Sequence, residues 1–243
     1  MKIVVPIKSI NNAKQRLAAL LSNAERSQLM SHMIDDVLAA AQLAVQSSSA
    51  QISGVIVVTG DAQVARQAAL YRARVLPEPN ERSGVGDEAL CAAVSMAANL
   101  LATEGEDSVL ILPADVPLVT ASSLTQLLLQ HSKGRALEQP AVTLVAARSD
   151  GGTNALLLSP PQVMPPMFGH NSCQRHTRWA QANNITPQLQ SVPELALDID
   201  TVADLQALMQ QPLRSATQRY LVDSGIAEKI GHQPQNKTGR AVR

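Results

Sequence analysis

Short apolar runs alternate with longer amphipathic stretches along most of the chain. The apolar runs have the length and composition of buried β-strands, and they occupy residues 3–7, 55–59, 74–76, 109–112, 141–146 and 155–158. Two further short strands are predicted at residues 189–192 and 197–199. Strands that alternate with helical stretches predict an α/β protein with a mostly parallel sheet flanked by helices.

Helix starts are marked by residues that cap helices. Ser22 and Glu25 have the spacing of a capping box, and the apolar residues after them recur at helical spacing. Thr201 and Asp204 repeat this spacing, with Asp in the Glu position. Further helices are predicted to follow residues 61, 86, 120 and 171.

The length of 243 residues suits one large α/β domain, which we assign to residues 1–211. Residues 212–243 hold six Lys or Arg against two acidic residues, with few apolar residues after Ile230. We expect a short helix followed by a basic, disordered tail. A solvated tail is the more ordinary interpretation of such a charge run, and an arm that binds a partner is the alternative.

Composition narrows the function classes. The 20 basic and 20 acidic residues cancel and aromatics make up 2% of the chain, which disfavours nucleic-acid binding through a basic field or stacked bases. No apolar run reaches the ~18 residues of a membrane span, and the N-terminus lacks the apolar core of a signal peptide. Cys91 and Cys173 fit no metal spacing, so we expect two reduced thiols in a cytoplasmic protein.

Acidic residues follow two apolar segments. Asp115 comes three residues after the run 109–112 ends, and ligands of open α/β sheets bind outside the carboxyl ends of the strands. Asp198 and Asp200 would point to one face of an extended segment, about 6.6 Å apart, where they repel unless a cation is near. Asp200 could instead cap the next helix. Such carboxylates can hold Mg²⁺ against a phosphate, which predicts a metal-dependent enzyme acting on a nucleoside triphosphate.

Three cations, Lys8, Lys14 and Arg16, lie between the first strand and the first long helix. This is where α/β nucleotide enzymes place a phosphate-binding loop, and Lys and Arg can neutralise a triphosphate. The loop matches neither G-x-G-x-x-G nor the Walker A motif, which argues against dinucleotide oxidoreductases and P-loop NTPases. A solvated basic loop is the alternative.

Two glycine-containing segments are candidates for ligand contact. Gly151 and Gly152 lie between two predicted strands, where they permit a close backbone approach or simply a tight turn. The segment from Phe168 to Ser172 precedes a helix that bears Arg175, His176 and Arg178, and a helix start with cations nearby attracts anions. The five His residues form no zinc motif and no G-x-S-x-G elbow occurs, so zinc and serine hydrolases lack support.

Five short motifs occur in a specific order. They are Val-Pro-Ile-Lys with Ala-Lys-Gln-Arg-Leu, Leu-Pro-Ala-Asp-Val-Pro-Leu, Gly-Gly-Thr-Asn-Ala-Leu-Leu-Leu, Phe-Gly-His-Asn-Ser and Leu-Asp-Ile-Asp-Thr. Each motif is weak alone, but the series resembles the guanylyltransferases of coenzyme F-420 biosynthesis, called CofC or FbiD, over about residues 1–211.

The resemblance implies a nucleotidyltransferase fold, GT-A-like and Rossmann-like, similar to that of molybdenum-cofactor guanylyltransferases. It also implies that GTP and a phosphorylated three-carbon carboxylate give a guanosine-diphospho acid and pyrophosphate. By this analogy Mg²⁺ would be held by Asp115, Asp198 and Asp200, the acceptor by Thr153, Gly169 and Ser172, and the GTP phosphates by Lys8, Lys14 and Arg16. The implied partners are GTP and the small acid, with a second copy of the chain as a further candidate.

One motif departs from the family pattern. The family usually has Gly-Leu-Asn-x-Ala-Leu near the nucleotide, whereas this chain has Asp87 in the place of the Asn. Because Asp can accept hydrogen bonds from the guanine ring N–H and exocyclic amine, Asp87 is a candidate nucleotide contact.

Alternatives to the main hypothesis are a nucleotidyltransferase for a sugar phosphate or pterin, a GT-A glycosyltransferase and a non-enzymatic GTP sensor. Among the acceptors, phosphoenolpyruvate and 3-phosphoglycerate are favoured as common central metabolites.

Overall fold

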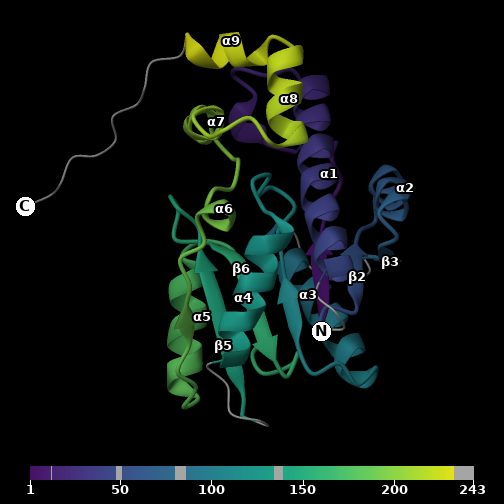
Figure 1. Cartoon of the computed structure of the whole chain (residues 1–243), viewed down its shortest axis with the longest axis vertical. Coiled ribbons are helices and arrows are strands. Elements are labelled where there is room, and N and C mark those ends of the chain that lie inside the picture. The colour runs from purple at the N-terminus through teal and green to yellow at the C-terminus, as the bar shows by residue number, and fades with distance from the viewer. Residues whose placement is uncertain (12, 48–50, 80–85, 134–138, 233–243) are drawn as a thin grey trace, which may run out of the picture.

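A computed structural model describes residues 1–11, 13–47, 51–79, 86–133 and 139–232. Within them lies one seven-stranded sheet in the order β3-β2-β1-β4-β6-β5-β7 (Figure 1). The strands are β1 (Lys2–Pro6), β2 (Gly54–Val58), β3 (Arg74–Leu76), β4 (Val109–Ile111), β5 (Ala141–Ala146), β6 (Thr153–Ser159) and β7 (Gln188–Leu189). Only β6 among these runs antiparallel to its neighbours, so the predicted mostly parallel sheet is confirmed.

Alternation along the strands divides the core between the two faces of the sheet. On β1, Ile3 and Val5 point to one face and Val4 to the other, and all three are fully buried. Both faces must therefore be covered by helices, as is typical of parallel sheets. In register, Val4 lies beside Ile56 of β2 and Ile111 of β4, which places β1 at the centre of the parallel part.

Helices cover both faces. The helices α1 (Asn23–Ser47), α2 (Ala62–Leu70), α4 (Ala121–Lys133) and the short α6 (Pro193–Ala196) pack on the face of Ile3 and Val5. The helices α3 (Asp87–Thr103) and α5 (Ser172–Ala182) pack on the opposite face. A 3₁₀ turn, η1 (Gln15–Leu17), precedes α1. Among the described helices, none combines the length and apolarity needed to cross a membrane.

A third apolar cluster lies at the end of the molecule drawn at the top of Figure 1. There α7 (Val202–Met209), α8 (Ala216–Asp223) and α9 (Ile226–Gly231) pack near the start of α1. Leu221 and Ile226 are fully buried in this cluster, and Asp36 of α1 accepts hydrogen bonds from the N–H groups that begin α8. The structure thus has two packed helices where the sequence predicted one. The tail predicted to be disordered falls largely on residues 233–243, outside the described residues.

Two strand predictions near the end of the domain need correction. The predicted strand 189–192 is shorter and shifted, because β7 covers Gln188–Leu189 and Pro193 then begins α6. The predicted strand 197–199 is wrong. This segment is extended at Leu197, but it pairs with no strand of the described sheet, because it runs past the end of β4, where Ile199 N–H donates to the carbonyl of Asp115 at 3.0 Å.

Candidate active site

The principal cavity lies where the chain connectivity changes direction across the sheet. From β1 the chain builds β2 and β3 on one side and then returns to add β4 on the other, so β1 and β4 form a switch point. Because β6 is antiparallel to β4, the start of β6 lies at the edge where β4 ends. A cavity of about 610 Å³ opens there, a size typical of small-molecule sites.

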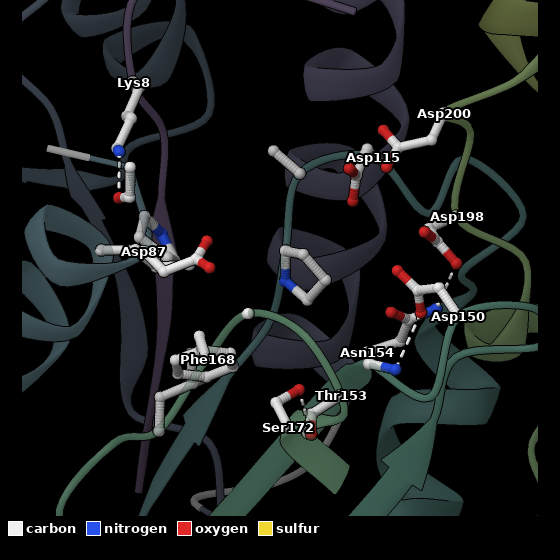
Figure 2. Close-up of a pocket in the computed structure, with 18 of the residues that line it drawn as sticks. Lys8, Asp87, Asp115, Asp150, Thr153, Asn154, Phe168, Ser172, Asp198 and Asp200 are labelled. Carbon is white, nitrogen blue, oxygen red and sulfur yellow. Dashed lines mark hydrogen bonds between the residues drawn. The ribbon is translucent and has the colours of Figure 1, made fainter. Parts of the chain in front are cut away.

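The cavity is lined by side chains from several elements, drawn in Figure 2. It gathers most residues proposed from sequence: Lys8, Arg16, Asp87, Asp115, Thr153, Gly169, Ser172, Asp198 and Asp200. Lys14 lines an adjoining cavity of about 530 Å³, together with Lys8, Arg16, Asp115 and Asp200. The structure therefore brings all ten residues to one region, although their individual roles stay predictions.

Lys14 joins two of the three carboxylates. Its Nζ lies 2.6 Å from Asp115 Oδ2 and 2.7 Å from Asp200 Oδ1, and its side chain is only 7% exposed. Burial alone would lower the pKa of Lys14, but the two carboxylates raise it above its ordinary value. Burial likewise opposes ionisation of Asp200, yet Lys14 and then Arg16 hold the pKa of Asp200 below its usual range. Lys14 thus supplies a cation to Asp115 and Asp200, whereas the pair considered from sequence was Asp198 and Asp200.

The Asp200 carboxylate is available to bind Lys14 because other residues cap α7. Thr201 and Asp204 form the predicted capping box, in which each side chain accepts from the main chain of the other. The alternative role of Asp200 as a helix cap is therefore not observed. Leu197 and Ile199 are buried in the third cluster, which leaves Asp198 and Asp200 facing the cavity.

Asp198 has a different environment from Asp200. Burial, with smaller contributions from Asp115 and Asp200, raises its pKa to about 6, against a hydrogen bond that favours the ionised form. The donor of that bond is Asn154 Nδ2, 3.0 Å from Asp198 Oδ1. Sequence analysis did not single out Asn154, although its place directly after Gly-Gly-Thr was a usable signal. A carboxylate with a raised pKa beside two others attracts a cation.

The other two cations differ in how firmly they are held. Lys8 Nζ donates a hydrogen bond to the carbonyl of Gly86, which joins the first loop to the start of α3 (Figure 2). The side chain of Arg16 is 69% exposed, and its Nη1 lies 3.7 Å from Asp200 Oδ2. Arg16 is thus free to reorient toward a ligand at small cost.

Asp87 and Gly169 lie in direct contact. Gly169 has a φ of +105°, and a Cβ at this position would collide with the Asp87 carboxylate. Only glycine allows the loop to pass this close to the start of α3. The candidate nucleotide contact and one candidate acceptor contact are therefore adjoining positions. Residues 84 and 85, which precede Asp87 in the departing motif, lie outside the described residues.

At the far end of the cavity Thr153 and Ser172 lie side by side. Ser172 Oγ donates to Thr153 Oγ1 at 3.0 Å (Figure 2). The first two N–H groups of α5 are already used, since Ser172 N donates to the carbonyl of Gly169 and Cys173 N to that of Gly151. A hydroxyl group, rather than these amides, is therefore the donor that this end offers to a ligand.

His176 corrects an expectation from the sequence. It was counted among the cations near the start of α5, but burial and then Arg175 lower its pKa to about 4. The side chain is therefore neutral near pH 7. It lies beneath the cavity, bonded to Thr153 and to the main chain of Met167.

The oxygen-rich carboxylate set suits a hard cation such as Mg²⁺ in its chemistry. As placed here, no three His, Cys, Asp or Glu side chains among the described residues converge into a metal-binding group. The reason is visible at Asp115 and Asp200, whose facing oxygens hold Lys14 Nζ. Residues that would hold a metal ion are Asp115, Asp198 and Asp200, with Lys14 displaced toward the ligand.

Comparisons with known proteins agree with this geometry. The model of a family described as "Guanylyl transferase CofC like" matches residues 1–241. A phosphoenolpyruvate guanylyltransferase of Sphaerobacter thermophilus is 36% identical over 210 residues, covering 84% of this chain and 90% of the relative. A 3-phospho-D-glycerate guanylyltransferase of Phenylobacterium zucineum is 33% identical, with coverages of 87% and 90%.

A 2-phospho-L-lactate guanylyltransferase of Methanosphaera stadtmanae is 27% identical over 229 residues, covering 94% of this chain and 92% of the relative. Among solved structures, a nucleotidyl transferase from Methanothermobacter thermautotroptrophicus matches with a TM-score of 0.58 at 16% identity, covering 91% of this chain and 98% of that one. At this identity the structural likeness shows the fold alone, and it confirms the predicted nucleotidyltransferase fold.

Proposed function

The chain belongs to the CofC guanylyltransferase family, and we propose that it transfers GMP from GTP to a phosphorylated three-carbon carboxylate in coenzyme F-420 biosynthesis. The observation that carries the proposal is the cavity at the switch point. It places Lys8, Asp115 and Asp200 at one end and the hydroxyl groups of Thr153 and Ser172 at the other, with Asp150 and Asp198 beside Asn154 (Figure 2). The first end suits a triphosphate, and the second suits the acid that receives GMP.

In the proposed reaction a phosphate oxygen of the acceptor attacks the α-phosphorus of GTP. A new P–O bond forms, the bond to the bridging β-phosphate oxygen breaks, and pyrophosphate leaves. The attacking oxygen is already largely ionised at pH 7, because the second pKa of a phosphate monoester is about 6. No general base is needed, in keeping with the neutral, buried state of His176.

Repulsion between two polyanions is then the main barrier. Lys8 and Arg16 line the cavity and Lys14 lines the adjoining one, which supports a role for all three in binding phosphate groups. A bound Mg²⁺, held by the three aspartates, would neutralise charge on the phosphates and the leaving pyrophosphate. Displacement of Lys14 from Asp115 and Asp200 would add its charge to the phosphates when the metal replaces it there.

Asp87 is proposed to read the base. Its carboxylate is exposed at the start of α3 and lines the cavity, and it can accept from the ring N–H and the exocyclic amine of guanine. Adenine lacks this pair of donors on one edge. We expect Asp87→Ala, which removes both acceptor oxygens, to reduce the preference for GTP over ATP.

The acceptor is proposed to be phosphoenolpyruvate or 3-phosphoglycerate. The two relatives named for these acids are 36% and 33% identical to this chain, whereas the relative named for 2-phospholactate is 27% identical. The three acids differ in the geometry between phosphate and carboxylate. A strict preference for phospholactate would contradict this part of the proposal.

The test is a pyrophosphate-release assay with GTP, Mg²⁺ and each of the three acids, separately and in competition, with products identified by mass spectrometry. ATP and CTP serve as nucleotide controls, and EDTA removes the metal. GTP-dependent release with one or more of the acids is expected. GTP binding without release would point to a sensor, and release only with a sugar phosphate would point to another nucleotidyltransferase activity.

A further inference from the structure

His176 occupies the junction of the three segments that form the acceptor end of the cavity. It is fully buried on α5, one turn after Ser172. Its ring lies edge-on to Phe168, with centroids 5.4 Å apart and planes at 75°. It also contacts the main chain of Met167 and the side chain of Thr153, the first residue of β6. One side chain thereby links helix, loop and strand.

The hydrogen bonds of His176 determine where its ring proton lies. Met167 N–H donates to Nε2 at 2.9 Å, so Nε2 must be an acceptor without a proton. The ring is neutral near pH 7, because burial, followed by the charge of Arg175, lowers its pKa to about 4. The single ring proton therefore lies on Nδ1, which donates to Thr153 Oγ1 at 3.1 Å.

This arrangement fixes the hydrogen-bonding role of Thr153. Its Oγ1 accepts from His176 Nδ1 and, at 3.0 Å, from Ser172 Oγ, which uses both hydroxyl lone pairs. The remaining hydroxyl hydrogen takes part in none of the hydrogen bonds found among the described residues. Thr153 lines the cavity, so it faces a ligand only as a donor.

We propose that His176 is the positioning residue of the acceptor site: its Nδ1–H tautomer, set by the Met167 main chain, makes Thr153 a dedicated donor to an oxyanion of the bound acid. The inference rests on the proposed guanylyltransfer. Without the Nδ1 donor, Thr153 can turn its hydrogen toward the ring or Ser172 instead of the ligand. A misdirected hydrogen bond to a charged group corresponds to a loss of about ten-fold in acceptor affinity.

A second buried histidine provides a matched control. His131 is also almost fully buried, and its Nδ1 and Nε2 lie 2.8 Å from the hydroxyls of Thr143 and Ser159. Neither hydroxyl lines the active-site cavity. A substitution at His131 damages a comparable buried network without touching the acceptor site, which separates a structural effect from a positioning effect.

Two substitutions separate the functions of the two ring nitrogens. In His176→Asn the amide nitrogen can take the place of Nδ1 and still donate to Thr153. In His176→Gln the longer side chain can take the place of Nε2 and accept from Met167, but the donor to Thr153 is lost. We expect His176→Gln to raise the KM for the acid about ten-fold, with the KM for GTP little changed, and His176→Asn to recover most of this loss.

His131→Gln is expected to leave both KM values near those of the unaltered enzyme. The inference is overturned if His176→Gln keeps the acceptor KM, if Asn and Gln raise it equally, or if His131→Gln raises it as much. Activity of the unaltered enzyme is measured first with GTP and the three acids. Its absence would reject the proposed function and would be recognised before any variant is made.

The tautomer can be tested without activity and without a variant. Long-range ¹H–¹⁵N correlation spectra of the unaltered protein are expected to show a neutral His176 with a protonated Nδ1 at about pH 7. A protonated Nε2 or an imidazolium would overturn the inference. Because this measurement needs only the folded protein, it remains decisive even if the His176 variants fold poorly.

Discussion

Replacing Lys14 with methionine removes one charge from the carboxylate cluster while keeping most of the apolar stem. In the structure Nζ lies 2.6 Å and 2.7 Å from Asp115 and Asp200, and the Lys14 side chain is 7% exposed. Loss of one partner from a buried ion pair costs about 3–5 kcal/mol, because the other charge is left without compensation. The side chains of Asp115 and Asp200 are 24% and 35% exposed, so solvent screens part of the uncompensated charge. We therefore expect the free energy of unfolding to fall by about 3 kcal/mol, at the low end of this range.

The assay is thermal unfolding with and without Mg²⁺. For a chain of this size about 3 kcal/mol corresponds to a fall in Tm of about 6–12 °C in the absence of metal. Added Mg²⁺ should restore much of the loss, since a ligand at one hundred times its Kd stabilises by about 2.7 kcal/mol. The unaltered protein should gain less, because Lys14 competes with the metal for the same oxygens.

Lys229→Met is the matched control. Lys229 Nζ also lies 2.7 Å from a carboxylate, that of Glu25, but the Lys229 side chain is 48% exposed. Such a surface pair contributes at most about 1 kcal/mol. An equal loss of stability in the two variants would refute the argument from burial. An equal gain from Mg²⁺ in Lys14→Met and the unaltered protein would refute competition between lysine and metal.

The remaining predictions concern activity and the C-terminal helices. Asp115→Asn and Asp198→Asn should remove most pyrophosphate release with unchanged circular dichroism; near-normal turnover at saturating Mg²⁺ would reject them as metal ligands. Activity should fall below about pH 6, because Asp198, whose pKa is raised, then takes up a proton. Excess Mg²⁺ should move this fall in activity to lower pH, because the metal ion competes with the proton for the carboxylate. Thr153→Ala should weaken acceptor use about ten-fold to a hundred-fold with GTP affinity retained. A loss of GTP affinity with normal acceptor affinity would show that Thr153 binds GTP and not the acceptor. Truncation after Gln211 should lower Tm by more than about 10 °C or prevent folding, whereas a cut after Gly231 should be tolerated; equal melting of both would show that α8 and α9 add no stability.

The strands of the sheet were predictable because their signal is local. Predicted bounds for β3 and β5 agree with the structure, and those of β1, β2 and β4 differ by one residue or less at each end. The segment 197–199 shows the limit of this signal. Its apolar pattern matches a strand, but pairing depends on where the segment lies, and it runs past the end of β4, where Ile199 bonds to Asp115. Only the assembled sheet contains that information.

The C-terminal helices show a second limit. The prediction of a disordered tail rested on the low apolar content after Ile230, and it did not anticipate that Leu221 and Ile226 are buried in the third cluster. These two residues are buried because the start of α1 extends beyond the sheet and needs a cover. The burial of these two residues therefore depends on the length of α1, and the local sequence pattern of α8 and α9 carries no information about that length.

At the active site, positions were more predictable than interactions. Strand ends and capping motifs indicated where the carboxylates lie, but Lys14 is 101 and 186 residues from the two aspartates it joins. It reaches them from a left-handed backbone conformation with φ of 53°, uncommon for lysine. The burial of His176 could not be predicted from the sequence either. The sequence therefore suggested a charged His176, whereas burial in the structure lowers its pKa and keeps it neutral.

The candidate acceptor contacts Thr153 and Ser172 are uncharged, which suits the task proposed for them. A lysine or arginine bonded to the acceptor phosphate would hold the acid firmly, but it would also withdraw charge from the oxygen that must attack GTP. A hydroxyl donor such as Thr153 orients an oxyanion with less loss of nucleophilicity, because neutral hydrogen bonds neutralise less charge than ion pairs. The cations Lys8, Lys14 and Arg16 line a different part of the site, where we propose that the triphosphate binds. On this argument a buried, uncharged His176 suits the site better than the cation that the sequence suggested, since it orients a donor without adding charge.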